Sequence, residues 1–444
     1  MNKNTNSHRQ YRLWFALAAL FLISLACSTA DLSQLLNPAA AVPTRIPIVT
    51  AAPTQPPQAA ESLERQLLIF EELWTVVNDD YVYPDFNGVD WQATRLAYQA
   101  RIEAGMSAEE FYLAMDEMIV MLGDEHSAYL SPEMVAEEDA EFAGEFEYVG
   151  FGVYMQAVPE RARAVILLVF PNSPAEAAGL KSRDSILLVG GEPVLDENGG
   201  IMEAIRGPEG STAILTVQSP GEEPRDIEIS RAALNVSTPV PYEVLTTPAG
   251  QRIGYVLVAS FADSTVDEAL AEALRTMSAD EPLDGLIMDN RFNEGGYFDV
   301  LSNVLGYFMP DGTVGYFVSR TEQEAFDVRA EDINGSQNLP LVLMVAEGTV
   351  SAGEIMGGIL VDFGRAYIIG ETTFGNVESL WAYDFDDGSR AWIAHDTFRA
   401  ANNPDANWED TGIIPDLVVP VNVDEFALQN DPAVIAALAY FDQP

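Results

Sequence analysis

Apolar positions change their spacing along the chain, and each change predicts a different kind of structure. Within residues 61–140 the apolar residues recur every three or four positions, which is typical of helices that bury one face. A later helix in this part begins with the capping box Ser107–Glu110 and ends near Gly123. We therefore predict a helical N-terminal part, whose first apolar stripe comprises Leu63, Leu67, Phe70, Leu73, Trp74 and Val77.

The spacing shortens in residues 141–232 and lengthens again after them. Brief apolar runs separated by glycine and proline, ending in the hairpin pattern "STAILTVQSPGEEPRDIEISRAA", predict a β-rich domain. In residues 233–425 continuous apolar runs such as "LDGLIMDNRF" and "LPLVLMVAEG" alternate with helical segments. That alternation predicts an α/β core, with a mixed sheet covered by helices on both faces. Residues 426–444 complete the chain as a C-terminal helix and tail.

The first 60 residues have the character of an export signal and a tether. Basic residues precede an apolar run of 14 residues, Leu13–Ala26, which is followed by Cys27. The cysteine after "SLA" resembles a bacterial lipoprotein processing site, although Ser24 stands where that pattern usually has leucine. We predict that residues 1–27 are a lipoprotein signal with Cys27 lipidated; an uncleaved anchor and ordinary signal cleavage are the alternatives. Residues 28–60, rich in Pro, Ala and Thr, are a tether, so the protein is expected outside the cytoplasm, membrane-anchored at the cell envelope.

Charge and composition exclude several classes of partner and cofactor. Lys and Arg number 22 against 69 Asp and Glu, and the formal net charge of −47 argues against binding nucleic acid. The single cysteine allows no intrachain disulfide, and with three scattered histidines the chain has no zinc-binding motif. No P-loop and no dinucleotide fingerprint follows a strand, so no cofactor and no metal are predicted.

Five stretches in a fixed order resemble the C-terminal processing, or tail-specific, serine peptidases. These stretches are "LGDEHSAYLSP", "SPAEAAGLKSRDSILLVGG", "LDGLIMDNRFNEGGYFDVL", "GTVSAGEIMGGILVDFGRAYIIGETTFG" and "GIIPDLVV". The resemblance covers roughly residues 62–425 and implies a helical part, a PDZ domain at residues 141–232 and an α/β peptidase core at 233–425. It implies an endopeptidase that acts on protein or peptide substrates.

Ser351 has two interpretations. By local pattern "SAGE" is a capping box, with Ser351 as N-cap and Glu354 at the third helical position. By resemblance Ser351 is the nucleophile, and a helix N-terminus suits this role because its free N–H groups attract an oxyanion. The oxyanion donors implied by the resemblance are the backbone of Ala352 and of Gly295 or Gly296.

The general base is not the one that most members of the family use. Those members read "TFGKG", with a lysine base and a glutamine four residues on, whereas this chain has Asn376 and Leu380. Asparagine has no basic lone pair, so it cannot take the proton of the serine. Glu378 is a weak substitute. Relatives of the tricorn type use a histidine and a late glutamate, which match His126 and Glu409 here, so we predict a Ser351–His126–Glu409 triad.

The remaining histidines and the PDZ domain complete the predictions. His8 lies in the signal, and His395 is predicted to be structural, although it stays an alternative base. The PDZ domain would capture free C-termini on the backbone of its ligand loop, which comprises Val149, Gly150, Phe151, Gly152 and Val153. The predicted function is an extracytoplasmic serine endopeptidase that selects substrates by their C-termini. A catalytically impaired pseudoprotease that holds peptides is the alternative, and an esterase is a third reading.

Overall fold

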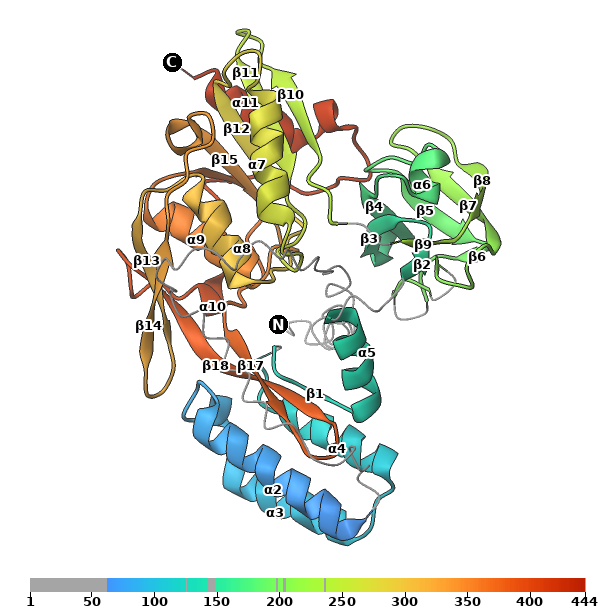
Figure 1. Cartoon of the computed structure of the whole chain (residues 1–444), viewed down its shortest axis with the longest axis vertical. Helices are drawn as coiled ribbons and strands as arrows, with labels where there is room; N and C mark the ends of the chain where they lie inside the picture. Colours follow the sequence, from blue (N-terminus) through green and yellow to red (C-terminus); the bar gives the residue numbers. More distant parts are fainter. Residues whose placement is uncertain are drawn as a thin grey trace, which may run out of the picture.

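The computed structural model describes residues 62–443, apart from residue 125 and residues 143–147, 197–198, 203–204 and 235–236. The predictions for the signal, His8, Cys27 and the tether therefore lie outside the described residues. A helical part, a small β-rich domain and a larger α/β core can be followed in Figure 1. Within the described residues, no helix has both the length and the apolar character of a membrane span, and no group of acidic, His or Cys side chains is suited to a metal.

The helical part consists of α2 (Leu63–Asp80), α3 (Trp91–Glu103) and α4 (Ala108–Val120). The predicted capping box at the start of α4 is present: Ser107 and Glu110 exchange both hydrogen bonds. Most of the predicted apolar stripe of α2 is buried, but Leu63 at the first helical position is 47% exposed. α5 (Pro132–Phe142) follows the short strand β1 (Ala128–Leu130).

A long ribbon joins the helical part to the core. β17 (Ser379–Asp384) and β18 (Arg390–Ala400) are antiparallel, and Phe385, Ala391 and Ile393 pack into the same hydrophobic cluster as the helices. β1 pairs with β18, and β18 continues to β13 (Gly312–Val318) and β14 (Gln323–Val328). The chain just before β1, which carries His126, is therefore fixed to a strand of the core.

The β-rich domain has the strand order β3-β4-β5-β7-β8, with β3 at an edge. In its described residues the domain has one short α-helix, α6 (Pro174–Ala177), and the predicted hairpin is formed by β7 and β8. The strands are β2 (Tyr148–Gly150), β3 (Val153–Val158), β4 (Arg163–Val169), β5 (Ser185–Val189), β6 (Glu192–Pro193), β7 (Thr212–Gln218), β8 (Arg225–Ser230) and β9 (Ala232–Leu234), with the 3-10 turn η3 (Pro159–Arg161).

The core is built on a six-stranded sheet of order β10-β11-β12-β15-β16-β19. β10 is antiparallel to β11 and the other neighbours are parallel, so the sheet is mixed, as predicted. Its strands are β10 (Tyr242–Thr246), β11 (Arg252–Leu257), β12 (Gly285–Asp289), β15 (Leu341–Val345), β16 (Tyr367–Gly370) and β19 (Leu417–Val418). The helices of the core are α7 (Val266–Met277), α8 (Phe298–Gly306), α9 (Ala352–Asp362), α10 (Trp408–Thr411) and α11 (Pro432–Phe441). Two 3-10 turns, η5 (Ser336–Asn338) and η6 (Leu428–Asn430), also belong to this part, and a third, η2 (Phe86–Gly88), lies between α2 and α3.

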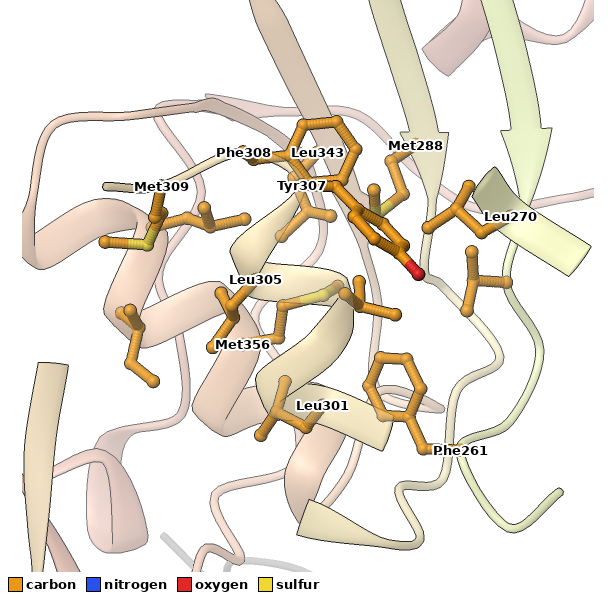
Figure 2. Close-up of a cluster of buried hydrophobic side chains, with 14 of the residues drawn as sticks. Phe261, Leu270, Met288, Leu301, Leu305, Tyr307, Phe308, Met309, Leu343 and Met356 are labelled. Carbon is orange, nitrogen blue, oxygen red and sulfur yellow. The ribbon is translucent and has the colours of Figure 1, made fainter. Parts of the chain in front are cut away.

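The two faces of this sheet are covered differently. On one face α7, α8 and α9 bury the alternate side chains Val256, Leu286 and Leu343 in one cluster, part of which is shown in Figure 2. The other face is covered by α11 and by strand β4 of the β-rich domain, whose Val165 and Leu167 belong to the same hydrophobic cluster as the core sheet. Helices therefore lie on both faces, as predicted, but the small domain also packs directly on the sheet.

Candidate active site

Ser351 lies in a strained turn between β15 and α9. Its backbone has φ 54° and ψ −126°, a conformation that L-residues rarely adopt, and its N–H donates to the carbonyl of Asn376 at 2.9 Å. Such a conformation costs about 1–3 kcal/mol and is found mainly at functional sites. The capping-box interpretation is wrong, because the Ser351 side chain makes no cap hydrogen bond. The hydroxyl is left free for chemistry.

Glu354 braces the turn opposite the serine instead of capping the helix. Its buried carboxylate accepts hydrogen bonds from the hydroxyl of Thr373 and from the N–H groups of Gly375 and Asn376, the last two at 2.7 Å. Burial raises the pKa of Glu354 to about 7, against the opposing effect of these hydrogen bonds. Because Asn376 also receives the N–H of Ser351, Glu354 fixes the segment on which the nucleophile rests.

The predicted oxyanion donors are not equivalent: Gly295 lies against Ser351, whereas Gly296 packs against the backbone of Phe261 and Ala262. Gly295, at φ +98°, lies so close that a Cβ there would be 2.7 Å from Cβ of Ser351 and 2.9 Å from N of Ala352. Its own N–H donates to Oδ1 of Asn293 at 2.9 Å. Among the described residues, no acceptor is bonded to the N–H of Ala352 or of Gly296. These two groups are therefore the donors still available to an oxyanion.

His126 faces a carboxylate, but that carboxylate is Glu378. Nδ1 of His126 lies 3.7 Å from Oε2 of Glu378, within ion-pair distance, and Oε1 of Glu378 accepts from the Tyr83 hydroxyl at 2.9 Å. The Glu378 side chain is fully buried. Burial raises its pKa, but the interactions with His126 and Glu409 outweigh burial and leave the pKa of Glu378 below its ordinary value. Glu378 is therefore ionised beside the imidazole.

Glu409 lies behind Glu378. Its Oε2 accepts from the N–H of Val377 at 2.7 Å, and no ion pair between Glu409 and His126 occurs in the described part of the chain. Burial and the neighbouring carboxyl of Glu378 raise the pKa of Glu409 far above its usual range. The two carboxyls therefore titrate as a pair that holds one proton between them.

Asn376 occupies a dry position where the family usually has lysine. The residue is 1% exposed, and neither its Oδ1 nor its Nδ2 has a hydrogen-bond partner in the described structure. A buried amide without partners is costly. The backbone carbonyl of Asn376 accepts the N–H of Ser351, but the amide side chain of Asn376 offers no base.

His395 is held by its own strand neighbours. On β18 its ring stacks on Trp381, with centroids 3.9 Å apart, and its Nδ1 is 3.0 Å from Oδ2 of Asp396. Asp396 also accepts from the indole N–H of Trp381 at 3.0 Å. These contacts give His395 the structural role that the sequence predicts.

The predicted ligand loop joins β2 to β3 through a tight turn. Gly152 has φ +83°, and the carbonyls of Phe151 and Gly152 accept from Ala175 and Phe170 at 2.8 and 3.0 Å. The buried ring of Phe151 lies under the guanidinium of Arg231 at 4.7 Å. In the described structure the N–H groups of Phe151 and Gly152 have no acceptor, and β3 has an open edge. This arrangement can bind a carboxylate and add a peptide strand.

Comparisons with known proteins show the family of the chain. The sequence pattern of peptidase family S41 matches residues 252–419, that of the tricorn protease C1 domain residues 67–120, and that of a PDZ domain residues 165–219. A carboxyl-terminal-processing protease of Synechocystis sp. is 31% identical over 394 residues, which cover 87% of this chain and 88% of that protein. The chain belongs to peptidase family S41.

A further relative and a solved structure match most of this S41 peptidase. The chloroplastic carboxyl-terminal-processing peptidase 2 of Arabidopsis thaliana is 26% identical over 368 residues, covering 81% of this chain and 70% of that protein. The solved photosystem II D1 C-terminal processing protease has a TM-score of 0.56 at 25% identity, covering 80% of this chain and 92% of that one. The protein is therefore a serine-type peptidase with a PDZ domain, and the predicted fold class is confirmed.

Three residues of the site carry more than the sequence indicated. Glu378 ranks low by pattern, and Tyr83 and Asn293 carry no motif that marks them. The signal that could have found Glu378 is that it lies two residues after the missing lysine, so its side chain can reach the same site. The contact of Tyr83 spans 295 residues of sequence, and nothing in the local pattern indicates it.

Proposed function

We propose that this S41 peptidase cleaves peptide bonds with Ser351 as nucleophile and His126 as general base. The observation that carries the proposal is the 3.7 Å approach of Nδ1 of His126 to the buried carboxylate of Glu378. A carboxylate that faces Nδ1 favours the tautomer with the proton on that nitrogen, although no hydrogen bond joins the two groups in the structure, and Nε2 then keeps the lone pair that a base needs. The strained, uncapped Ser351 supplies the hydroxyl.

The chemistry then follows the order of acyl transfer. Oγ of Ser351 attacks the scissile carbonyl carbon while its proton passes to Nε2 of His126, and the carbonyl oxygen takes up the negative charge. The N–H groups of Ala352 and Gly296 stabilise that oxyanion, each such donor contributing about 3–4 kcal/mol. The C–N bond breaks as His126 returns the proton to the amine. Water then repeats the attack on the acyl-enzyme, and Ser351 regains its proton.

Glu378 and Glu409 together supply the carboxylate that orients His126. Glu378 faces His126 at 3.7 Å, beyond hydrogen-bond length, and its charge stabilises the imidazolium that forms in each step. Glu409, which the tricorn-like pattern indicates as the third member, acts through Glu378 by sharing a proton with it. Tyr83 donates to the other oxygen of Glu378 and fixes its orientation.

Substrates are selected by their C-termini. The free N–H groups of Phe151 and Gly152 suit a terminal carboxylate, and the open edge of β3 suits the residues before it. The sequence of residues 1–60 supports an extracytoplasmic, lipid-anchored protein with Cys27 as the modified residue. Incorporation of a clickable fatty acid that disappears in Cys27→Ser tests this location.

A fluorophosphonate probe on the purified protein tests the catalytic assignment. Labelling is expected to vanish in Ser351→Ala, to fall by at least about 10³ in His126→Ala, and to fall by about 10²–10⁴ in Glu378→Gln. His395→Ala is the matched histidine control and should label normally. Loss in His395→Ala with full labelling in His126→Ala would reassign the base. The probe is used with and without a C-terminal peptide, so that a PDZ-gated enzyme is detected.

The pseudoprotease alternative depends on Asn376 and Leu380, which replace the lysine and glutamine of most relatives. It predicts no labelling of Ser351 under either condition, together with retained binding of C-terminal peptides. Cleavage of a peptide by the wild-type protein, and not by Ser351→Ala, would exclude it.

A further inference from the structure

A buried cluster of alternating charges lies between the PDZ domain and the turn that carries the oxyanion glycines. Its centre is Arg291, which is 0% exposed and lies two residues after the end of β12. Nε and Nη2 of Arg291 donate to the two carboxylate oxygens of Asp289 at 2.8 and 2.6 Å, and Nη2 also donates to Oδ2 of Asp431 at 2.9 Å. Tyr255 donates to Asp289 at 2.7 Å and closes this end of the cluster.

Asp431 receives a second arginine, and this one belongs to the PDZ domain. Nη1 of Arg183 lies 2.9 Å from the same Oδ2 of Asp431 that binds Arg291. The other oxygen of Asp431 accepts the N–H of Ala433 and caps α11. Burial raises the pKa of Asp431, but Arg291 and Arg183 outweigh burial and lower it, so the group is ionised. One carboxylate therefore bridges the PDZ domain and the core.

The charges of the cluster balance only when the PDZ domain is docked. Arg183 and Arg291 supply two positive charges, and Asp289 and Asp431 supply two negative ones. Withdrawal of Arg183 leaves one uncompensated negative charge among buried groups, which is unfavourable in a medium of low polarity. Arg291 then has to adjust or the cluster has to admit water.

Any adjustment of Arg291 reaches the catalytic turn within a few bonds. The carbonyl of Arg291 packs against Gly348, where an added Cβ would lie 2.8 Å from it. Two residues further on, Oδ1 of Asn293 holds the N–H of Gly295, and the carbonyl of Asn293 holds the N–H of Val350. Asn293 thus ties the oxyanion turn to the residue that precedes the nucleophile.

We infer that Asp431 is a positioning residue that sets the oxyanion turn through Arg291 according to whether Arg183 of the PDZ domain is docked. This inference rests on the proposed function of the same site. Asp431 touches no reacting atom. It makes the geometry around Gly295 and Gly296 depend on the placement of a domain whose ligand loop lies elsewhere.

Arg183→Gln tests the link, and Arg161→Gln is its matched control. Arg161 also joins the PDZ domain to the chain before α11, through Asp424 at 2.6 Å and Asn422 at 2.7 Å, but it does not contact Arg291 or Asp431. In Arg183→Gln we expect the rate constant for cleavage at saturating peptide to fall about tenfold with KM little changed. Arg161→Gln should keep the wild-type rate, Arg183→Lys should recover part of it, and Asp431→Asn combined with Arg183→Gln should cost no more than either alone.

Hydrogen exchange in residues 290–297 keeps the inference distinct from the proposed function. It needs no catalysis, so a silent wild-type enzyme would refute the proposed function without deciding this point. Faster exchange of these amides in Arg183→Gln than in Arg161→Gln supports the link. Equal exchange in the two variants, or an equal loss of rate in both, overturns it, because the loss would then reflect domain docking in general.

Discussion

Replacing Gly295 by alanine gives a quantitative test of the oxyanion site. At φ +98° a side chain costs about 1–2 kcal/mol. The new Cβ would lie 2.7 Å from Cβ of Ser351, about 1 Å inside normal contact, and overpacking of this kind costs a further 1–3 kcal/mol or so. The methyl would also lie 2.9 Å from N of Ala352, in the path of the oxyanion. Loss of one donor lowers the rate by about 10²–10³.

We therefore expect Gly295→Ala to reduce both peptide cleavage and fluorophosphonate labelling by about 10²–10³ and to lower the free energy of unfolding by roughly 2–4 kcal/mol. Gly250→Ala is the matched control, because Gly250 has φ +90° but no atom within 4 Å of the added Cβ. It should lose about 1–2 kcal/mol of stability and no activity. Urea unfolding and labelling kinetics measure the two quantities. Wild-type labelling by Gly295→Ala would refute the assignment of this turn.

Three further predictions follow from single residues. Burial raises the pKa of half-buried Glu294 to about 7. The folded protein is therefore most stable below pH 4.5, where Glu294 is protonated in both the folded and the unfolded state, and it loses stability as pH rises through 7. The free energy of unfolding of Glu294→Gln should exceed that of wild type by roughly 2 kcal/mol at pH 8 and equal it at pH 4. In Gly152→Ala the added Cβ would overlap the N-cap side chain of α6 at 2.2 Å, so fluorescence anisotropy should show loss of C-terminal peptide binding, whereas Gly210→Ala, with open space, should bind normally. Asn376→Lys in a His126→Ala background should restore probe labelling at alkaline pH, because the ammonium of the new lysine is then deprotonated and can act as the base. If labelling does not recover at any pH, the amine of the lysine cannot reach the serine.

The sequence predicted the order of domains and most of the elements, because periodicity reports burial along one element at a time. The buried face of α2 and the strand-to-helix turn at Ser351 are of this kind. Leu63 was predicted on the buried face and is 47% exposed, since it starts the helix and has no preceding turn to pack beneath it.

The arrangement of the site depends on contacts between distant parts of the chain. That Glu378 and not Glu409 faces His126 follows from how the β17–β18 ribbon meets the helical part, and no local pattern reports this. The resemblance pointed to the right region through Glu409, but the pairing of the two carboxyls needed coordinates. The PDZ strand on the face of the core sheet could not be predicted for the same reason.

The pairing of β1 with β18 also bears on how the protein is made. His126 lies next to residues 128–130, whose strand partner is residues 390–392, later in the chain than Ser351. During synthesis the nucleophile emerges from the ribosome before the strand that holds the proposed base in position. A nascent chain therefore carries Ser351 and His126 for some time without an assembled site, and the peptidase becomes competent only after residues 390–392 have been translated.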